Sequence, residues 1–129
     1  MKKFQPTKPS ALLIGKWQPW HDGHTNLFKK AVEKHGQVTI VCQSLDTTDD
    51  DVLYDFQQTA HLIRATLEPE GYHLGSDYIV MEIPRVAEIS TGQSPDFQTV
   101  VYEDKDLNGW IKSSNLRKEI NESKATNVG

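Results

Sequence analysis

The sequence predicts an α/β fold built on a parallel sheet, because two kinds of periodicity alternate along it. Short aliphatic or β-branched runs, typical of buried strands, alternate with segments whose apolar residues recur every three or four positions, as on one face of a helix. The order strand, helix, strand, helix, strand favours parallel strands joined by right-handed crossovers. A chain of 129 residues has room for one domain with one core.

The first strand, turn and helix are expected between residues 11 and 36. The run Ala11-Leu12-Leu13-Ile14 is typical of a buried strand, and Gly15 ends it. Pro19 keeps the next turn out of a helix. A helix is then expected from about Gly23 to Lys34, ended by His35-Gly36. Its apolar face consists of Leu27, Phe28, Ala31 and Val32.

The second strand and second helix follow a similar pattern. The β-branched run Gln37–Cys42 predicts a strand, and Ser44–Tyr54 is expected to be a polar, acidic loop. Asp55 is expected to cap a helix, with Gln58 three residues later completing a capping box. The sequence Glu68-Pro69-Glu70-Gly71 stops that helix.

Further strands are expected over Asp77–Ile83 and Gln98–Tyr102, and a short helix from Ser113 or Ser114 through Ile120. Residues 1–9 contain three lysines and two prolines without periodicity, which indicates a surface arm. Residues 121–129 form a polar tail. Residues 10–120 are therefore expected to be the domain.

Composition narrows the classes of partner and the compartment. A net charge of −4 offers no basic surface for nucleic acid or an anionic membrane. The single cysteine, Cys42, cannot form an internal disulfide, and no apolar stretch is long enough to span a bilayer or to form a signal peptide. These observations predict a cytoplasmic protein. Its acidic loop, with aspartates at 46, 49, 50 and 51, is either a solvated segment or a lid near bound Mg²⁺.

Residues 15–24, Gly-Lys-Trp-Gln-Pro-Trp-His-Asp-Gly-His, carry the chemistry. His21 and His24 are three positions apart, so both lie on one face of the first helical turn. A first turn presents free backbone N–H groups and the positive end of the helix dipole. Gly23 leaves no side chain where an anion would approach the backbone. The segment therefore predicts a phosphate site at the carboxyl end of a parallel strand.

These ten residues resemble the signature of the HxGH nucleotidylyltransferases, in the variant that reads glycine, basic residue, aromatic, glutamine, proline, aromatic, His-x-Gly-His. Lys16 stands where arginine is usual, and Trp17 and Trp20 where phenylalanine is commonest. The resemblance implies a single Rossmann-like domain, with helices on both faces of a parallel sheet. It also implies transfer of a nucleoside monophosphate, AMP in preference to CMP, from ATP or CTP to a phosphorylated small molecule, with release of pyrophosphate.

The resemblance implies that His21, His24 and Lys16 are the catalytic residues. The imidazoles would donate to α- and β-phosphate oxygens, and Lys16 would hold the α-phosphate or the acceptor phosphate. For three residues a structural role is the open alternative to nucleotide contact. These roles are packing for Trp17, hydrogen bonding that satisfies the turn for Gln18, and a plain turn for Gly92. Mg²⁺ would arrive with the triphosphate, and no metal site of the protein itself is expected. The remaining candidates for nucleotide contact in this part of the chain are Gly15, Trp17, Gln18, Gly23 and Gly92.

A second segment, Ile111-Lys112-Ser113-Ser114-Asn115-Leu116-Arg117, resembles the other signature of this family, isoleucine-serine-serine-threonine-x-isoleucine-arginine. Small hydroxyls at a helix N-terminus leave its N–H groups open to an oxyanion, and Arg117 can offer a forked donor to phosphate. The residues expected to hold the leaving pyrophosphate are Lys112, Ser113, Ser114 and Arg117. An ordinary capped surface helix is the alternative.

Two other functions stay open at this point. The first is a catalytically weak nucleotide-binding module of the same fold, because Lys112 replaces a neutral hydroxyl and Gln57-Gln58 stand where relatives carry a glutamate-arginine pair. The second is a metal-dependent hydrolase with His21 and His24 as ligands. The sequence leaves open the identity of the acceptor and the oligomeric state, a homo-oligomer included.

Overall fold

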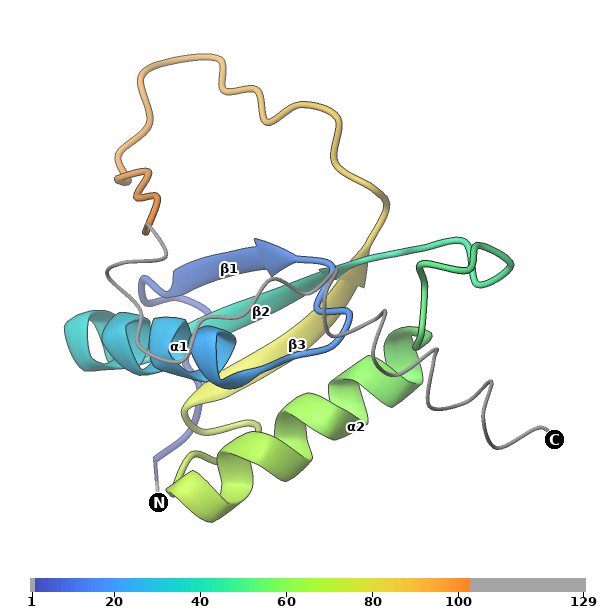
Figure 1. The fold of residues 1–129 in the computed structure, drawn as a ribbon. Helices are drawn as coiled ribbons and strands as arrows, with labels where there is room; N and C mark the ends of the chain where they lie inside the picture. Colours follow the sequence, from blue (N-terminus) through green and yellow to red (C-terminus); the bar gives the residue numbers. More distant parts are fainter. Residues whose placement is uncertain (1, 103–129) are drawn as a thin grey trace, which may run out of the picture.

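A computed structural model describes residues 2–102 and shows an α/β fold (Figure 1). Three parallel strands pair in the order β1-β2-β3. The predicted alternation of strands and helices is confirmed over this part of the chain. The elements are β1 (Ala11–Gly15), α1 (Asp22–His35), β2 (Val38–Gln43), α2 (Phe56–Leu67), the 3-10 helix η1 (Glu68–Glu70) and β3 (Tyr78–Ile83).

Both helices pack on the same face of the sheet (Figure 1). On that face Leu13 of β1 lies beside Ile40 of β2, which lies beside Val80 of β3. Two right-handed crossovers that advance in the same direction across a sheet leave both helices on one side, so the strand order accounts for this layering. The expected second helical layer is not found among residues 2–102. The helical residues buried against the sheet are Phe28, Ala31, Ile63 and Leu67.

The strand expected over residues 98–102 is absent from the described part of the chain. No strand among residues 2–102 pairs with its β-branched residues, and Val100 and Val101 are 50% and 81% exposed. β-propensity reflects packing on a half-buried sheet, and it does not create a strand where nothing pairs. The helix expected from Ser113 or Ser114 lies outside the described residues.

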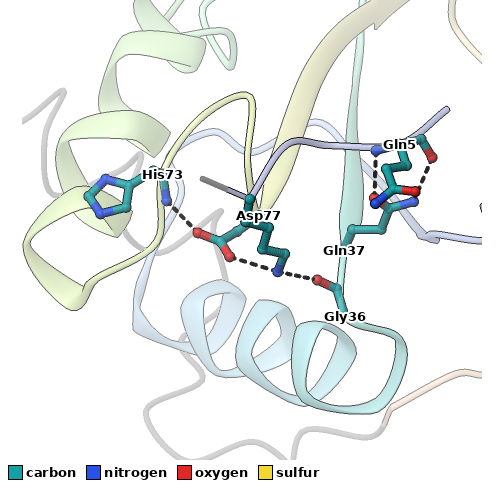
Figure 2. Close-up of polar contacts among 6 residues, drawn as sticks. Gln5, Gly36, Gln37, His73 and Asp77 are labelled. Carbon is teal, nitrogen blue, oxygen red and sulfur yellow. Dashed lines mark hydrogen bonds and ion pairs between the residues drawn. The ribbon is translucent and has the colours of Figure 1, made fainter.

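The N-terminal segment is exposed, as expected, but it is anchored to the amino-terminal end of the sheet (Figure 2). Lys2 Nζ donates to the Gly36 carbonyl at 2.8 Å and pairs with an Asp77 carboxylate oxygen at 3.0 Å. The other Asp77 oxygen accepts the His73 backbone N–H. Gln5 and Gln37 exchange hydrogen bonds through the Gln37 side-chain amide and the Gln5 backbone. These contacts lie at the amino-terminal ends of the strands, and the 15–24 turn lies at their carboxyl ends.

The predicted helix signals are confirmed. Gly36 ends α1 with a φ of 84°, a left-handed conformation that favours glycine. Asp55 begins α2, and its Oδ1 accepts the Gln58 N–H while the Gln58 side chain accepts the Asp55 N–H. The capping box therefore sets where α2 starts, directly after the acidic loop.

Tyr78 supplies a test of the core. Its ring is fully buried at the start of β3, edge-on to Phe28, and burial raises the pKa of the hydroxyl to about 12. Within residues 2–102 that hydroxyl has no hydrogen-bond partner. Because an unsatisfied buried hydroxyl costs free energy, Tyr78→Phe is expected to raise the free energy of unfolding by about 1 kcal/mol.

Urea denaturation of the wild type, Tyr78→Phe and Tyr78→Leu measures this effect. Tyr78→Leu removes the ring as well and is expected to destabilise the protein by about 2 kcal/mol or more. A Tyr78→Phe variant less stable than the wild type would contradict the assignment of an unsatisfied hydroxyl.

Candidate active site

The turn after β1 is built around Trp17. This residue has a φ of 52°, which brings its indole back against Gly15. A Cβ on Gly15 would lie 2.8 Å from the indole ring, so only glycine fits at that position. The indole Nε1–H donates to the Val41 carbonyl of β2 at 3.0 Å, and the side chain is 5% exposed. The structure therefore places Trp17 in the core, where it ties the turn to the sheet.

Gln18 fastens the turn to the far end of the acidic loop. Its side-chain oxygen accepts the backbone N–H groups of Leu53 and Tyr54, each at 2.9 Å, and its amide nitrogen donates to the Tyr54 carbonyl at 3.0 Å. Of the two roles left open for Gln18, the structure shows the one that satisfies the backbone. Its partners lie about 35 residues away in the chain, so no local pattern indicates them.

His21 and His24 cap the first turn of α1 reciprocally. His21 is the N-cap, and its Nδ1 accepts the Gly23 N–H at 3.1 Å. The His21 backbone N–H in turn donates to His24 Nδ1, also at 3.1 Å. The two rings stack, with centroids 3.7 Å apart and planes 20° apart. Some of the backbone N–H groups expected to be open to an anion are therefore satisfied by the histidines themselves.

These hydrogen bonds determine where the protons lie. Since each Nδ1 accepts a hydrogen bond, a neutral ring carries its proton on Nε2. Burial lowers the pKa of His21, partly offset by the Asp22 carboxylate. For His24, burial first and the neighbouring His21 second lower the pKa to about 3. At neutral pH the pair therefore consists of two uncharged rings, each with an Nε2–H donor.

Aromatic side chains surround the His24 ring. The Trp17 ring meets it edge-on at 4.8 Å, and the Trp20 ring lies at 5.5 Å. Trp20 is itself held by its Nε1–H, which donates to the Thr25 hydroxyl at 2.9 Å. His24 is 5% exposed and His21 is 9% exposed. The surrounding rings restrict the rotation of the imidazoles and lower the local polarity.

A cavity of about 150 Å³ opens at the carboxyl ends of all three strands. Lys16 follows β1 and lines the cavity, as do Cys42 of β2 and Glu82 of β3. The histidines do not line it, so the site has two neighbouring parts joined by residues 16–18: the histidine pair and the cavity. The full lining is Lys16, Gln18, Cys42, Gln43, Leu45, Thr47, Tyr54, Asp55, Phe56, Thr59 and Glu82.

Sequence reasoning missed most of this lining. In the sequence, Cys42 indicates only that no internal disulfide can form. In the structure, burial and the Glu82 charge raise the pKa of its thiol to about 12, so it stays protonated. Neither Glu82 nor Tyr54 belongs to a sequence motif. The one signal that could have found them is position, because side chains at the carboxyl ends of parallel strands gather at one edge.

The other candidates lie elsewhere. Gly92 is exposed, and a Cβ there would meet no atom within 4 Å among the described residues, so both a close approach by a nucleotide and a plain turn stay open for it. In the acidic loop Asp46 accepts hydrogen bonds from the Thr48 N–H and hydroxyl, which stabilise the loop locally. The second predicted motif lies outside the described residues: Lys112, Ser113, Ser114 and Arg117.

Comparison with known proteins adds no assignment: no family model matches this chain, and no curated protein is significantly similar to it. Within the described part of the chain, no helix is long and apolar enough to cross a bilayer. Nor do three or more histidine, cysteine or acidic side chains of residues 2–102 gather as they would around a metal ion. Any functional proposal must therefore come from the site's own geometry and from the sequence motif.

Gly15→Ala tests the construction of the turn. The new Cβ would overlap the Trp17 indole, which cannot move away without losing its hydrogen bond to Val41. We expect a loss of about 1–3 kcal/mol in the free energy of unfolding, as for other overpacked positions. Gly92→Ala is the matched control and should leave stability unchanged, because its Cβ meets open space. Equal stability of the two variants would show that Trp17 does not pack against Gly15.

The histidine pair also predicts how stability depends on pH. The pKa of His24 is lower in the folded protein than its usual 6.5, so the unfolded chain binds more protons below pH 6.5. His24 alone should therefore lower the free energy of unfolding by roughly 1.4 kcal/mol for each pH unit well below 6.5, down to pH 3. His21 acts in the same direction.

Denaturant titrations between pH 7.5 and 5 measure this slope above the range in which carboxylates titrate. In His24→Asn the slope should be smaller, because the asparagine amide does not titrate. The helix cap is kept, because the amide oxygen can still accept the His21 N–H. A slope unchanged by the substitution would show that His24 is not the group responsible.

Proposed function

We propose that this protein is a nucleotidylyltransferase of Rossmann-like fold. It transfers a nucleoside monophosphate, AMP in preference to CMP, from an NTP to a phosphorylated small molecule and releases pyrophosphate. The observation that carries the proposal is the pair of stacked, uncharged imidazoles at the start of α1, each with its proton on Nε2. The order of residues in the 15–24 turn and its resemblance to the HxGH signature support the same function.

The reaction needs no nucleophile from the protein. A phosphate oxygen of the acceptor attacks the α-phosphorus of the NTP in line, a new P–O bond forms, and the bond to the β-phosphate oxygen breaks as pyrophosphate leaves. Catalysis of such a step consists of positioning and of stabilising negative charge on the phosphoryl oxygens. Mg²⁺ enters as part of the NTP substrate.

Each feature of the turn has a task in this step. The Nε2–H groups of His21 and His24 donate to α- and β-phosphate oxygens from rings that the backbone holds in place. Preorganised donors need no reorientation when charge develops, and the surrounding rings of Trp17 and Trp20 strengthen them by excluding water. Lys16, which lines the cavity, supplies a positive charge.

The sheet is consistent with a Rossmann-like domain. Parallel strands in the order β1-β2-β3, with both crossovers on one face, correspond to one half of a doubly wound sheet. In such a fold β1 is central, and further helices cover the second face, on which Leu12 is 58% exposed here. The proposal includes this second layer, and it assigns pyrophosphate binding to Lys112, Ser113, Ser114 and Arg117.

His24→Asn and His21→Asn test the proposal without removing the helix cap. Asparagine can accept the same backbone N–H as Nδ1 does, but it lacks the Nε2–H. We expect turnover to fall by roughly 100-fold for either substitution, which is about 3 kcal/mol for one preorganised donor. The melting temperature at pH 7.5 should stay close to that of the wild type. His61→Asn, on the exposed side of α2, is the matched control and should retain full turnover.

The assay is pyrophosphate release from ATP and from CTP with a panel of phosphorylated acceptors. Normal turnover of both histidine variants would contradict the proposed site, and faster release from CTP would reverse the nucleotide preference. ATP binding without pyrophosphate release from any acceptor would indicate a nucleotide-binding module instead. Stoichiometric zinc in the purified protein would favour the metal-dependent hydrolase.

A further inference from the structure

We propose that Trp17 is a positioning residue for His24. The indole, held to β2 by its own hydrogen bond, sets the place of the imidazole relative to the sheet and with it the direction of the His24 Nε2–H. The inference rests on the proposed function, in which that N–H donates to a phosphate oxygen. In this assignment Trp17 does not touch the substrate, and its effect on His24 can be measured without turnover.

Two strands hold the indole of Trp17 in one position. Its Nε1–H donates to the Val41 carbonyl at 3.0 Å, and Val41 lies opposite Ile14 in the register of β1 and β2. The benzene ring of the indole lies against Gly15, where an added Cβ would come within 2.8 Å of it. The Trp17 side chain is also buried. The indole is therefore a fixed surface at the ends of β1 and β2.

His24 packs directly against this surface. The two ring centroids are 4.8 Å apart and the planes are 82° apart, an edge-to-face arrangement that aromatic rings favour. The His24 Nδ1 also accepts the His21 backbone N–H at 3.1 Å. An imidazole that turned away from this hydrogen bond would have to change its contact with the indole. The indole thus restricts the rotamers that His24 can adopt.

The other ring contacts of His24 lie within its own turn. The His21 ring stacks on it at 3.7 Å, and the Trp20 ring lies at 5.5 Å, with its Nε1–H on the Thr25 hydroxyl. These residues belong to α1 or to the turn directly before it, so they move with His24 if the start of the helix shifts. Among the aromatic side chains of residues 2–102 that contact His24, Trp17 is the one with a hydrogen bond to the sheet.

A constant position of His24 relative to the sheet matters because the proposed site has two parts. Lys16 lines the cavity at the carboxyl ends of the strands, whereas the histidines begin α1. A polyphosphate held by both parts needs the Nε2–H and the Lys16 ammonium at a constant separation. Val41, which holds the indole, directly precedes Cys42 of the cavity lining. Trp17 therefore connects His24 to a strand that forms the cavity, and donors fixed in this way need no reorientation as charge develops.

Backbone amide hydrogen exchange in the full chain, without ligand, measures this role. The His21 N–H is protected while His24 Nδ1 accepts it, and the Phe28 N–H in the middle of α1 reports on opening of the whole helix. Trp17→Phe keeps an aromatic ring but loses the indole N–H. We expect exchange at His21 to rise roughly tenfold relative to exchange at Phe28 in this variant. A variant that only destabilised the fold would raise both rates equally.

Trp20→Phe is the matched control. It also loses an indole N–H, but one whose hydrogen bond to Thr25 does not reach the sheet. The ratio of the two exchange rates should stay within about twofold of the wild-type ratio. If Trp17→Phe does not fold, β-(3-benzothienyl)alanine at position 17 takes its place. This side chain has the shape of tryptophan with sulfur in place of the N–H, so it removes the hydrogen bond and keeps the packing.

Pyrophosphate release tests the consequence for the reaction. In Trp17→Phe we expect kcat to fall roughly tenfold while KM for ATP changes less than about twofold, because a misdirected donor mainly loses its interaction with the transition state. Exchange at His21 that rises no more than exchange at Phe28, an equal effect of Trp20→Phe on the exchange ratio, or an unchanged kcat would each overturn the inference.

Failure of the proposed function gives a different result. If exchange at His21 rises selectively in Trp17→Phe but the wild type releases no pyrophosphate with any acceptor, Trp17 positions His24 as inferred and the transferase activity is wrong. If the wild type is active and Trp17→Phe matches it in both exchange and kcat, the transferase is supported and the positioning role is wrong.

Discussion

Two hydrogen bonds from backbone N–H groups to imidazole Nδ1 atoms hold the start of α1, and the chemistry proposed for this protein depends on them. They satisfy helix donors that would otherwise need water or another cap. They also fix the tautomer, because a ring that accepts at Nδ1 is protonated at Nε2 when it is neutral. One local arrangement therefore caps the helix and orients two uncharged donors, which is the arrangement that the proposed action on a phosphate requires.

The surroundings of the pair keep that arrangement in place. Burial makes the charged form of His24 unfavourable, and the rings of Trp17 and Trp20 leave its imidazole little freedom to rotate. Gln18 connects the same turn to the loop before α2, so the strand end, the helix start and the loop form one unit. A change in the cavity lining near Tyr54 is thereby linked to the turn that carries the histidines.

Local patterns were sufficient to predict most of the described fold. The aliphatic run of β1, the capping box of Asp55 and Gln58, and the glycine at position 36 each act within a few residues, and the structure has each where it was expected. The predicted strand at 98–102 failed because strand formation requires a partner that propensity does not reveal. The placement of both helices of residues 2–102 in one layer likewise depends on the order of strands, which periodicity does not determine.

The sequence predicts which residues of the 15–24 turn lie close together, but it does not predict most of their partners or most of the cavity lining. His21, His24 and Lys16 stand in a contiguous motif, so their proximity follows from the chain itself. The roles of Trp17 and Gln18 depend on partners in β2 and in the loop before α2, about 24 to 36 residues away. Glu82 and Cys42 become neighbours only through the parallel register of β2 and β3.

The most direct test of the central claim is ¹⁵N NMR of the histidine side chains from pH 8 to 5. The account predicts Nε2-protonated, neutral rings for His21 and His24, with no titration of His24 in that range. Nδ1-protonated rings, or a His24 midpoint near 6.5, would contradict it.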